Sequence, residues 1–237
     1  MIDLLWLDGT WSKPGARSPV SEALRRAVAG ARVRFRYVDY PAAYGPATDR
    51  WDVSIAESVD QGVHALTDAV RATPNLAVVG GYSQGAMAAV DFARDVLPHD
   101  HSLEVLAVAA LGNPYQPVHV GRGGIAAQLS VPRTLLSYYV PGDPIADLPL
   151  GSPLRSIADV TEWMSIRSPE ASWLWWQRSV LDRAIDTKYQ AWWQPWRWRD
   201  LASTVDYVNG YLGTKHTGDY ITGGHVQRLA RQIETLA

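Results

Sequence analysis

Short apolar runs alternate with segments of helical spacing along most of the chain. The runs typical of buried strands cover residues 2–7, 75–80, 103–111 and 134–140, and residues 33–38 alternate apolar and polar side chains as a half-buried strand does. Apolar positions at helical spacing occupy residues 21–29, 52–72, 86–97, 201–212 and 226–236. Repeated strand–helix units with apolar strands predict an α/β fold, with a mostly parallel sheet flanked by helices on both faces.

Polar side chains stand at or just past the ends of four predicted strands. They are Thr10, Ser83, Asn113 and Asp143. Because ligands bind at the carboxyl ends of the strands in such sheets, we expect these residues to surround a functional site.

The sequence Gly-Tyr-Ser-Gln-Gly at residues 81–85 stands between a predicted strand and a predicted helix. The pattern Gly-x-Ser-x-Gly also occurs by chance, since glycine and serine are common in turns. In a strand–turn–helix context, however, it is the nucleophile elbow of an α/β-hydrolase, whose glycines permit a sharp turn and leave room around the serine. We therefore expect Ser83 to be a nucleophile.

A nucleophilic serine needs a histidine as its base and a carboxylate to orient that histidine, in the chain order serine, acid, histidine. That order excludes or disfavours four of the six histidines: His64, His99, His101 and His119. Of the other two, His225 lies in a glycine-rich loop directly before the last helix, whereas His216 lies between charged residues in an apparently solvated loop. We expect His225 to be the base, with His216 as the alternative.

Two aspartates compete for the role of the acid. Asp143 follows an apolar strand by three residues, in the turn Pro141-Gly142-Asp143, and Asp147 stands four residues further along the same loop. An aspartate in such a turn often serves only to form it. We expect Asp143 to be the acid and keep Asp147 as its rival.

The reaction also needs backbone N–H donors for the oxyanion of the tetrahedral intermediate. One should be the N–H of Gln84, the residue after the nucleophile, and the other should come from a loop after an early strand. The segment at residues 8–11 is placed for this, and its Thr10 could add a hydroxyl; the alternative is that it forms only a tight turn.

The composition excludes several classes of function. The 22 basic and 24 acidic residues give a net charge of −2 and no basic run, so no nucleic acid is expected as a partner. The chain has no cysteine, which removes disulfides and thiolate metal sites, and no metal or cofactor motif is visible.

Acidic residues interrupt the first apolar run, which therefore does not resemble a signal peptide, and no run approaches the roughly 20 apolar residues of a membrane span. We expect a soluble protein made in the cytoplasm, and a monomer.

Taken together, the motifs resemble the cutinase-like α/β-hydrolases, and among them the lysin B esterases of mycobacteriophages. The resemblance rests on residues 8–11, 40–45, 81–85, 111–114 and 141–143 and on His225. It implies Ser83 as nucleophile, Asp143 as acid and His225 as base, and an ester between mycolic acids and arabinogalactan as the substrate. It also implies action at the host cell wall during phage-induced lysis. Secreted cutinases usually contain disulfides, so the absence of cysteine favours the phage enzymes.

A tryptophan-rich stretch at residues 151–200 fits the helical insertion that these esterases carry between the acid and the histidine. It holds eight of the eleven tryptophans: Trp163, Trp173, Trp175, Trp176, Trp192, Trp193, Trp196 and Trp198. We expect a single domain over residues 1–237, with 151–200 as an insertion or cap. Most of these rings should pack the insertion onto the domain, and we expect some to line the entrance for acyl chains or arabinose rings.

Two other functions compete with the mycolyl esterase. One is a general cutinase-like lipolytic or polysaccharide acyl esterase. The other is a cell-wall-binding module without catalysis, which would have no need of a serine, an acid and a histidine in this order.

Overall fold

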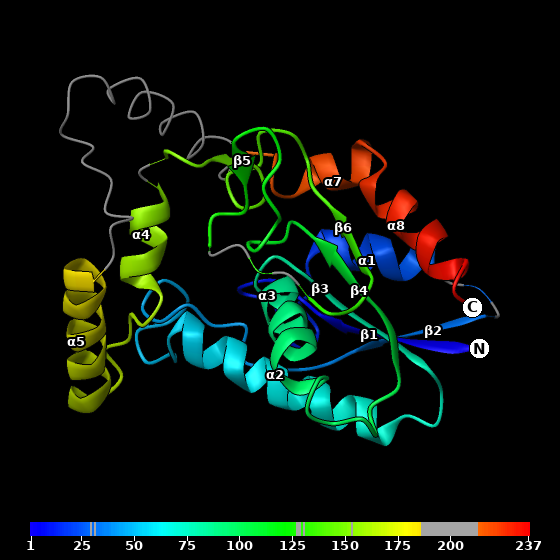
Figure 1. Cartoon of the computed structure of the whole chain (residues 1–237), viewed down its shortest axis with the longest axis horizontal. Coiled ribbons are helices and arrows are strands. Elements are labelled where there is room, and N and C mark those ends of the chain that lie inside the picture. The colour runs from blue at the N-terminus through cyan, green and yellow to red at the C-terminus, as the bar shows by residue number, and fades with distance from the viewer. Residues whose placement is uncertain (29, 31, 127–128, 130, 153, 186–212) are drawn as a thin grey trace.

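The computed structural model describes the chain except for residues 29, 31, 127–128, 130, 153 and 186–212. Its central sheet has five strands in the order β2–β1–β3–β4–β6, with every neighbouring pair parallel (Figure 1). The strands are β1 (Ile2–Leu7), β2 (Val33–Tyr37), β3 (Ala77–Tyr82), β4 (Val105–Leu111) and β6 (Leu135–Tyr138). The prediction of an α/β fold with a mostly parallel sheet is confirmed.

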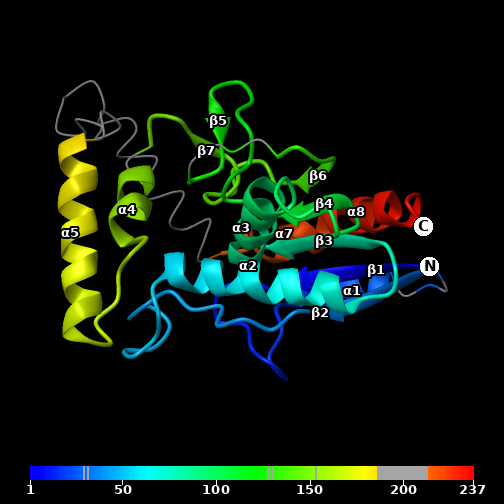
Figure 2. The same ribbon diagram turned by 60° about the horizontal axis from the view of Figure 1, so that its bottom comes forward.

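Helices cover both faces of this sheet (Figures 1 and 2). On one face α1 packs against α8, and on the other α2 packs against α3. Their bounds are α1 (Pro19–Ala27), α2 (Ile55–Ala72), α3 (Gln84–Asp91) and α8 (His225–Glu234). A helical layer on each side explains why the inner strands β1, β3 and β4 are apolar along almost their whole length, whereas β2, at the edge of the sheet, alternates.

The side chains of β1 show how the two layers share one strand. Leu5 and Leu7 belong to the core beneath α2 and α3, while Leu4 and Trp6 belong to the core beneath α1 and α8. All six residues of β1 are buried. The strand therefore anchors both cores and holds the loop that follows it in a fixed place.

Serine caps define where two of the predicted helices begin. The Ser18 side chain accepts a hydrogen bond from the Ser21 N–H at the start of α1, and the Ser54 side chain accepts one from the Glu57 N–H at the start of α2. Such caps satisfy N–H groups that have no partner inside the helix. α3 continues directly into a π-helical turn, η1 (Phe92–Val96).

Several short elements lie where a loop or an undivided insertion was expected. β5 (Arg122–Gly123) and β7 (Leu148–Pro149) form an antiparallel pair, and α7 (Gly218–Thr222) precedes α8. α4 (Leu154–Thr161) and α5 (Pro169–Ile185) lie side by side, within the expected insertion and away from the sheet (Figures 1 and 2).

The remainder of the expected insertion lies outside the described residues. The same holds for the helix expected at 201–212 and for four of the tryptophans: Trp192, Trp193, Trp196 and Trp198. The division of the chain into one domain with an insertion at 151–200 stays a prediction.

The order of the strands fixes where a site can form. The chain passes from β1 outward to β2 and then returns to the other side of β1 with β3, so the connections diverge between β1 and β3. Ligand sites in open α/β sheets lie at the carboxyl ends of the strands beside such a switch point. None of the described helices has the length and apolarity that crossing a bilayer demands.

Candidate active site

Ser83 stands on a sharp turn directly between β3 and α3. Its backbone angles, φ 54° and ψ −120°, are rare for a residue with a side chain. A Cβ at Gly81 would lie 2.1 Å from the carbonyl carbon of Gly85, and a Cβ at Gly85 would lie 2.2 Å from the oxygen of Leu7. The turn therefore requires both glycines, and it presents Ser83 beside the end of β1, as expected of a nucleophile elbow.

Ser83 begins a hydrogen-bonded chain of three side chains. Nε2 of His216 lies 2.9 Å from Oγ of Ser83, and Nδ1 of His216 lies 2.9 Å from both carboxylate oxygens of Asp143. Because a carboxylate only accepts hydrogen bonds, Nδ1 carries the proton in this arrangement and Nε2 is free to accept one from the serine. This is the geometry in which a histidine can deprotonate a hydroxyl.

The carboxylate of Asp143 is fully buried and held by two further donors. The backbone N–H of Ile145 donates to Oδ1 at 2.9 Å, and the hydroxyl of Tyr220 donates to Oδ2. Burial, together with the neighbouring Asp143 carboxylate, raises the pKa of Tyr220 well above its usual value, so this hydroxyl stays a neutral donor. A carboxylate held by several donors keeps its orientation toward the imidazole.

The imidazole of His216 is enclosed although its loop is polar. The ring of Tyr82 stacks on it at 5.2 Å between centroids, and the hydroxyl of Tyr82 donates to the carbonyl oxygen of His216. Gly112, with φ +60°, approaches so closely that a Cβ there would lie 3.0 Å from Cε1 of the ring. Only 4% of His216 is exposed.

The prediction that His225 partners Ser83 is wrong. His225 begins α8 after Gly224, and its ring lies beside that of Tyr220, with 5.8 Å between centroids, while the imidazole that contacts Ser83 is that of His216. Partial burial and the nearby Arg228 lower its pKa. His216, held in reserve as the alternative, occupies the position expected of His225.

The rival acid, Asp147, has a separate set of partners. Nε of Arg122 donates to its Oδ1 at 2.9 Å, and the N–H of Gly142 donates to its Oδ2 at 2.7 Å. Nε2 of His119 lies 3.3 Å from the same Oδ1. Asp147 thus holds the loop that carries Asp143, and Asp143 is the aspartate that contacts His216.

The loop expected to contribute an oxyanion donor lies against the nucleophile. A Cβ on Gly9 would lie 3.4 Å from Cβ of Ser83. The Asp8 carboxylate accepts hydrogen bonds from the Gly9 N–H at 2.8 Å and from the Ser18 N–H at 2.8 Å. The N–H of Gly9 is already bonded to Asp8. The next candidate along this loop for an oxyanion donor is therefore the N–H of Thr10.

Gln84 turns its side chain away from the serine. Its Nε2 donates to the oxygen of Ala43 at 2.8 Å, and its Oε1 accepts from the hydroxyl of Ser58 at 3.1 Å. Its backbone N–H belongs to the first turn of α3, where N–H groups lack acceptors within the helix. The bonded side chain therefore fixes the position of this N–H, and it does not compete with the N–H for an oxyanion.

Over the residues that the structure describes, no group of three potential metal-ligating side chains gathers in one place.

Sequence reasoning ranked His216 behind His225 because the residues around His216 are charged. Lys215 and Asp219 pair with each other at 3.5 Å on the outside of the turn, and the imidazole points inward. A usable signal was Tyr220, four residues later: a large aromatic side chain in so polar a stretch marks a segment that faces the core, and it is fully buried.

Comparisons with known proteins agree with this architecture. A sequence model of the family described as Cutinase matches residues 9–151, more than half of the chain. No curated protein matches the chain in a sequence search. The family match ends before both late histidines, so the geometry alone distinguishes His216 from His225.

Solved structures show a similar fold at low sequence identity. Lysin B from mycobacteriophage D29 is 18% identical with a TM-score of 0.60, covering 95% of this chain and 98% of its own. The catalytic core of acetyl xylan esterase from Trichoderma reesei is 22% identical with a TM-score of 0.49, covering 61% of this chain and 84% of its own. Cutinase from Trichoderma reesei is 20% identical with a TM-score of 0.37, covering 58% and 60%. The match of the cutinase family model over residues 9–151 shows that the chain belongs to the cutinase family.

Proposed function

We propose that this chain is a carboxylic ester hydrolase that uses Ser83 as nucleophile, His216 as general base and Asp143 as the orienting acid. The observation that carries the proposal is the unbroken hydrogen-bonded chain from Oγ of Ser83 through His216 to Asp143. Family membership supports the same reaction class.

In the first half of the reaction, Oγ of Ser83 attacks the ester carbonyl carbon while Nε2 of His216 takes the hydroxyl proton. The carbonyl oxygen becomes an oxyanion, for which we propose the N–H groups of Gln84 and Thr10 as hydrogen-bond donors. Collapse of this intermediate breaks the ester C–O bond, and His216 returns the proton to the departing alcohol. An acyl group remains on Ser83.

In the second half, a water molecule takes the place of the alcohol. His216 accepts its proton, the resulting hydroxide attacks the acyl carbon, and the carboxylic acid leaves as Ser83 regains its proton. Asp143 stays ionised throughout, because its task is to orient the imidazole and to stabilise the imidazolium that forms.

For the substrate, we propose the ester that joins mycolic acids to arabinogalactan. The resemblance to the lysin B esterases supports it, as does the similarity in fold to the D29 lysin B over nearly the whole of both chains. Exposed tryptophans on α5 supply apolar surface suited to a long-chain substrate. The enzyme would act at the mycobacterial cell wall.

The test has two stages. Hydrolysis of a p-nitrophenyl ester by the wild-type protein, lost in Ser83→Ala, is the expected result for an esterase; a wild-type protein with no activity would favour a wall-binding module instead. Incubation with purified mycolyl-arabinogalactan-peptidoglycan should then release free mycolic acid. Activity confined to short soluble esters would replace the mycolyl esterase by a general cutinase-like or polysaccharide acyl esterase.

A further inference from the structure

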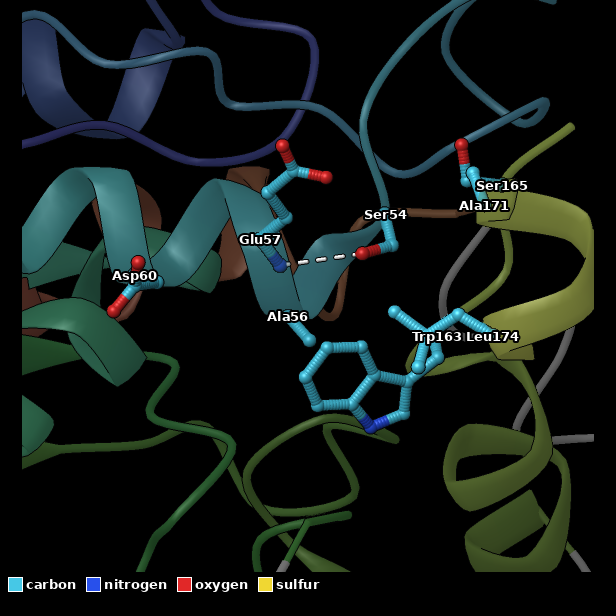
Figure 3. Close-up of a pocket in the computed structure, with 8 residues that line it drawn as sticks. All are labelled: Ser54, Ala56, Glu57, Asp60, Trp163, Ser165, Ala171 and Leu174. Carbon is cyan, nitrogen blue, oxygen red and sulfur yellow. Dashed lines mark hydrogen bonds between the residues drawn. The ribbon is translucent and has the colours of Figure 1, made fainter. Parts of the chain in front are cut away.

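A cavity of about 300 Å³ lies between the start of α2 and the segment leading into α5 (Figure 3). One wall is polar and comes from α2, with Ser54, Glu57 and Asp60. The other wall is mostly apolar, with Trp163, Ala171 and Leu174. The volume is at the lower end of the range for small-molecule sites, which suits a compact ring-shaped ligand.

The polar wall is acidic, but part of its charge is neutralised. Both carboxylate oxygens of Glu57 accept hydrogen bonds from Arg167, at 2.7 and 2.9 Å. Asp60 has its side chain 68% exposed, which leaves its carboxylate open to solvent. Carboxylate oxygens accept hydrogen bonds from hydroxyl groups, and the Ser54 hydroxyl adds a further polar group.

The apolar wall contains a flat aromatic surface. Figure 3 shows the indole of Trp163 next to Ala56, below the first turn of α2. From α5, the guanidinium of Arg178 lies over the same ring, 4.8 Å from its centroid. The indole is thus held in position, and the π face of such a ring attracts the polarised C–H groups of a ligand.

These two walls restrict the kind of occupant. An acyl chain would have to remove water from Glu57 and Asp60 without replacing their hydrogen bonds, which is unfavourable. An anion would be repelled by the same carboxylates. A neutral ring with hydroxyl groups on its edge and C–H groups on its face satisfies both walls, and a sugar has that chemistry.

The cavity is connected to the proposed reaction centre through the first turns of α2. Ser58, whose hydroxyl donates to the Gln84 side chain, follows Ser54 by one helical turn, or about 6 Å along the axis of α2. Gln84 is the neighbour of Ser83 in sequence. The start of α2 and the nucleophile elbow are thus connected through Gln84, and the proposal requires that a molecule whose ester lies at Ser83 extends past this contact to the cavity.

We propose that the cavity binds a sugar ring in the alcohol part of the ester substrate. The proposal rests on the esterase function proposed above. It identifies which part of the substrate this cavity binds.

Kinetics on two matched substrates test it: p-nitrophenyl decanoate, which has no sugar, and a decanoyl ester of methyl arabinofuranoside. Ala171→Phe fills the cavity, and Asp60→Asn removes the exposed charge. Asp68→Asn, on the exposed side of the same helix, is the control. Each of the first two variants should raise KM for the sugar ester, about tenfold for Ala171→Phe, with kcat and the p-nitrophenyl reaction unchanged.

Equal effects on both substrates, or none on either, overturn the sugar site while leaving the esterase intact. A wild-type protein that hydrolyses neither substrate overturns the esterase itself. Saturation-transfer NMR of methyl arabinofuranoside with Ser83→Ala provides a test without catalysis. Binding should disappear when Ala171→Phe is added, and binding that persists in the double variant contradicts the proposal, as does binding of a cationic amine in place of the sugar.

Discussion

The site around Ser83 and the surface of α5 lie in the same chain but are built differently. At Ser83, the side chains of His216 and Asp143 are buried, and each polar contact between them is a direct hydrogen bond. On α5, Trp173 and Trp176 stack on each other at 4.8 Å while each remains more than half exposed. The first region fixes a reaction geometry, and the second offers apolar surface that little of the described structure covers.

The contrast teaches where specificity and catalysis can change independently. Buried polar networks lose much when one member is removed, because its partners are left unsatisfied. Exposed aromatic side chains can be replaced at small cost to folding. Substitutions at the two regions should therefore differ in both size and kind of effect.

The largest difference should separate the two late histidines. His216→Ala removes the proposed base, and we expect kcat to fall by about 10⁴ to 10⁶ on p-nitrophenyl butyrate. His225→Ala, outside the hydrogen-bonded chain, should keep kcat within about threefold. Thermal melts check that both variants are folded. Loss of activity in His225→Ala with retention in His216→Ala would return the role to His225.

The aspartates of one loop provide the next comparison. Asp143→Asn should lower kcat by about 10³ to 10⁴, because the amide favours the wrong tautomer of His216. Asp147→Asn should act mainly on stability, lowering the free energy of unfolding by about 1–3 kcal/mol as Arg122 loses its charged partner. Rates and denaturant unfolding measured on both variants separate these effects, and near-normal turnover in Asp143→Asn would contradict the assignment.

The hydroxyl of Tyr220 should have a smaller effect on the same network. Tyr220→Phe keeps the buried ring but removes a donor to Asp143, and we expect kcat to fall about tenfold with KM unchanged. Tyr37→Phe is the matched control, since its hydroxyl donates to Glu22, on α1, at 2.9 Å. If both variants lose stability alike and neither changes kcat, Tyr220 serves only the packing of the core.

The smallest effect is expected on α5. Replacing Trp173 and Trp176 together by alanine should change the free energy of unfolding by less than about 0.5 kcal/mol. Turnover of short soluble esters should stay the same, while KM for a long-chain ester rises about threefold. A general loss of thermal stability would show instead that these rings pack the helix onto the domain, which would weaken the contrast between the two regions.

Much of the fold was predictable because a sheet covered on both faces produces continuous apolar strands. The run at residues 2–7 became β1, every residue of which is buried. The nucleophile elbow was predictable because its sharp turn needs glycines at fixed positions beside the serine, and this requirement is local in sequence. By contrast, α7 and the β5–β7 pair are too short to show a periodicity.

The choice between histidines was not predictable in the same way. Whether a side chain in a turn faces the core depends on contacts distant in sequence, here those of Tyr82 and Asp143 with His216. The loop position of His225 satisfied every local criterion. In the structure it begins α8, which packs against α1, and its ring lies beside that of Tyr220 and not beside Ser83.

The left-handed backbone of Ser83 has a consequence for how the protein can change over time. A residue with a side chain in such a conformation costs about 1–3 kcal/mol, and glycine largely avoids that cost. Ser83→Gly should therefore melt at a higher temperature than Ser83→Ala, although both are inactive. A lineage released from the need to hydrolyse esters would therefore gain stability by replacing this serine with glycine.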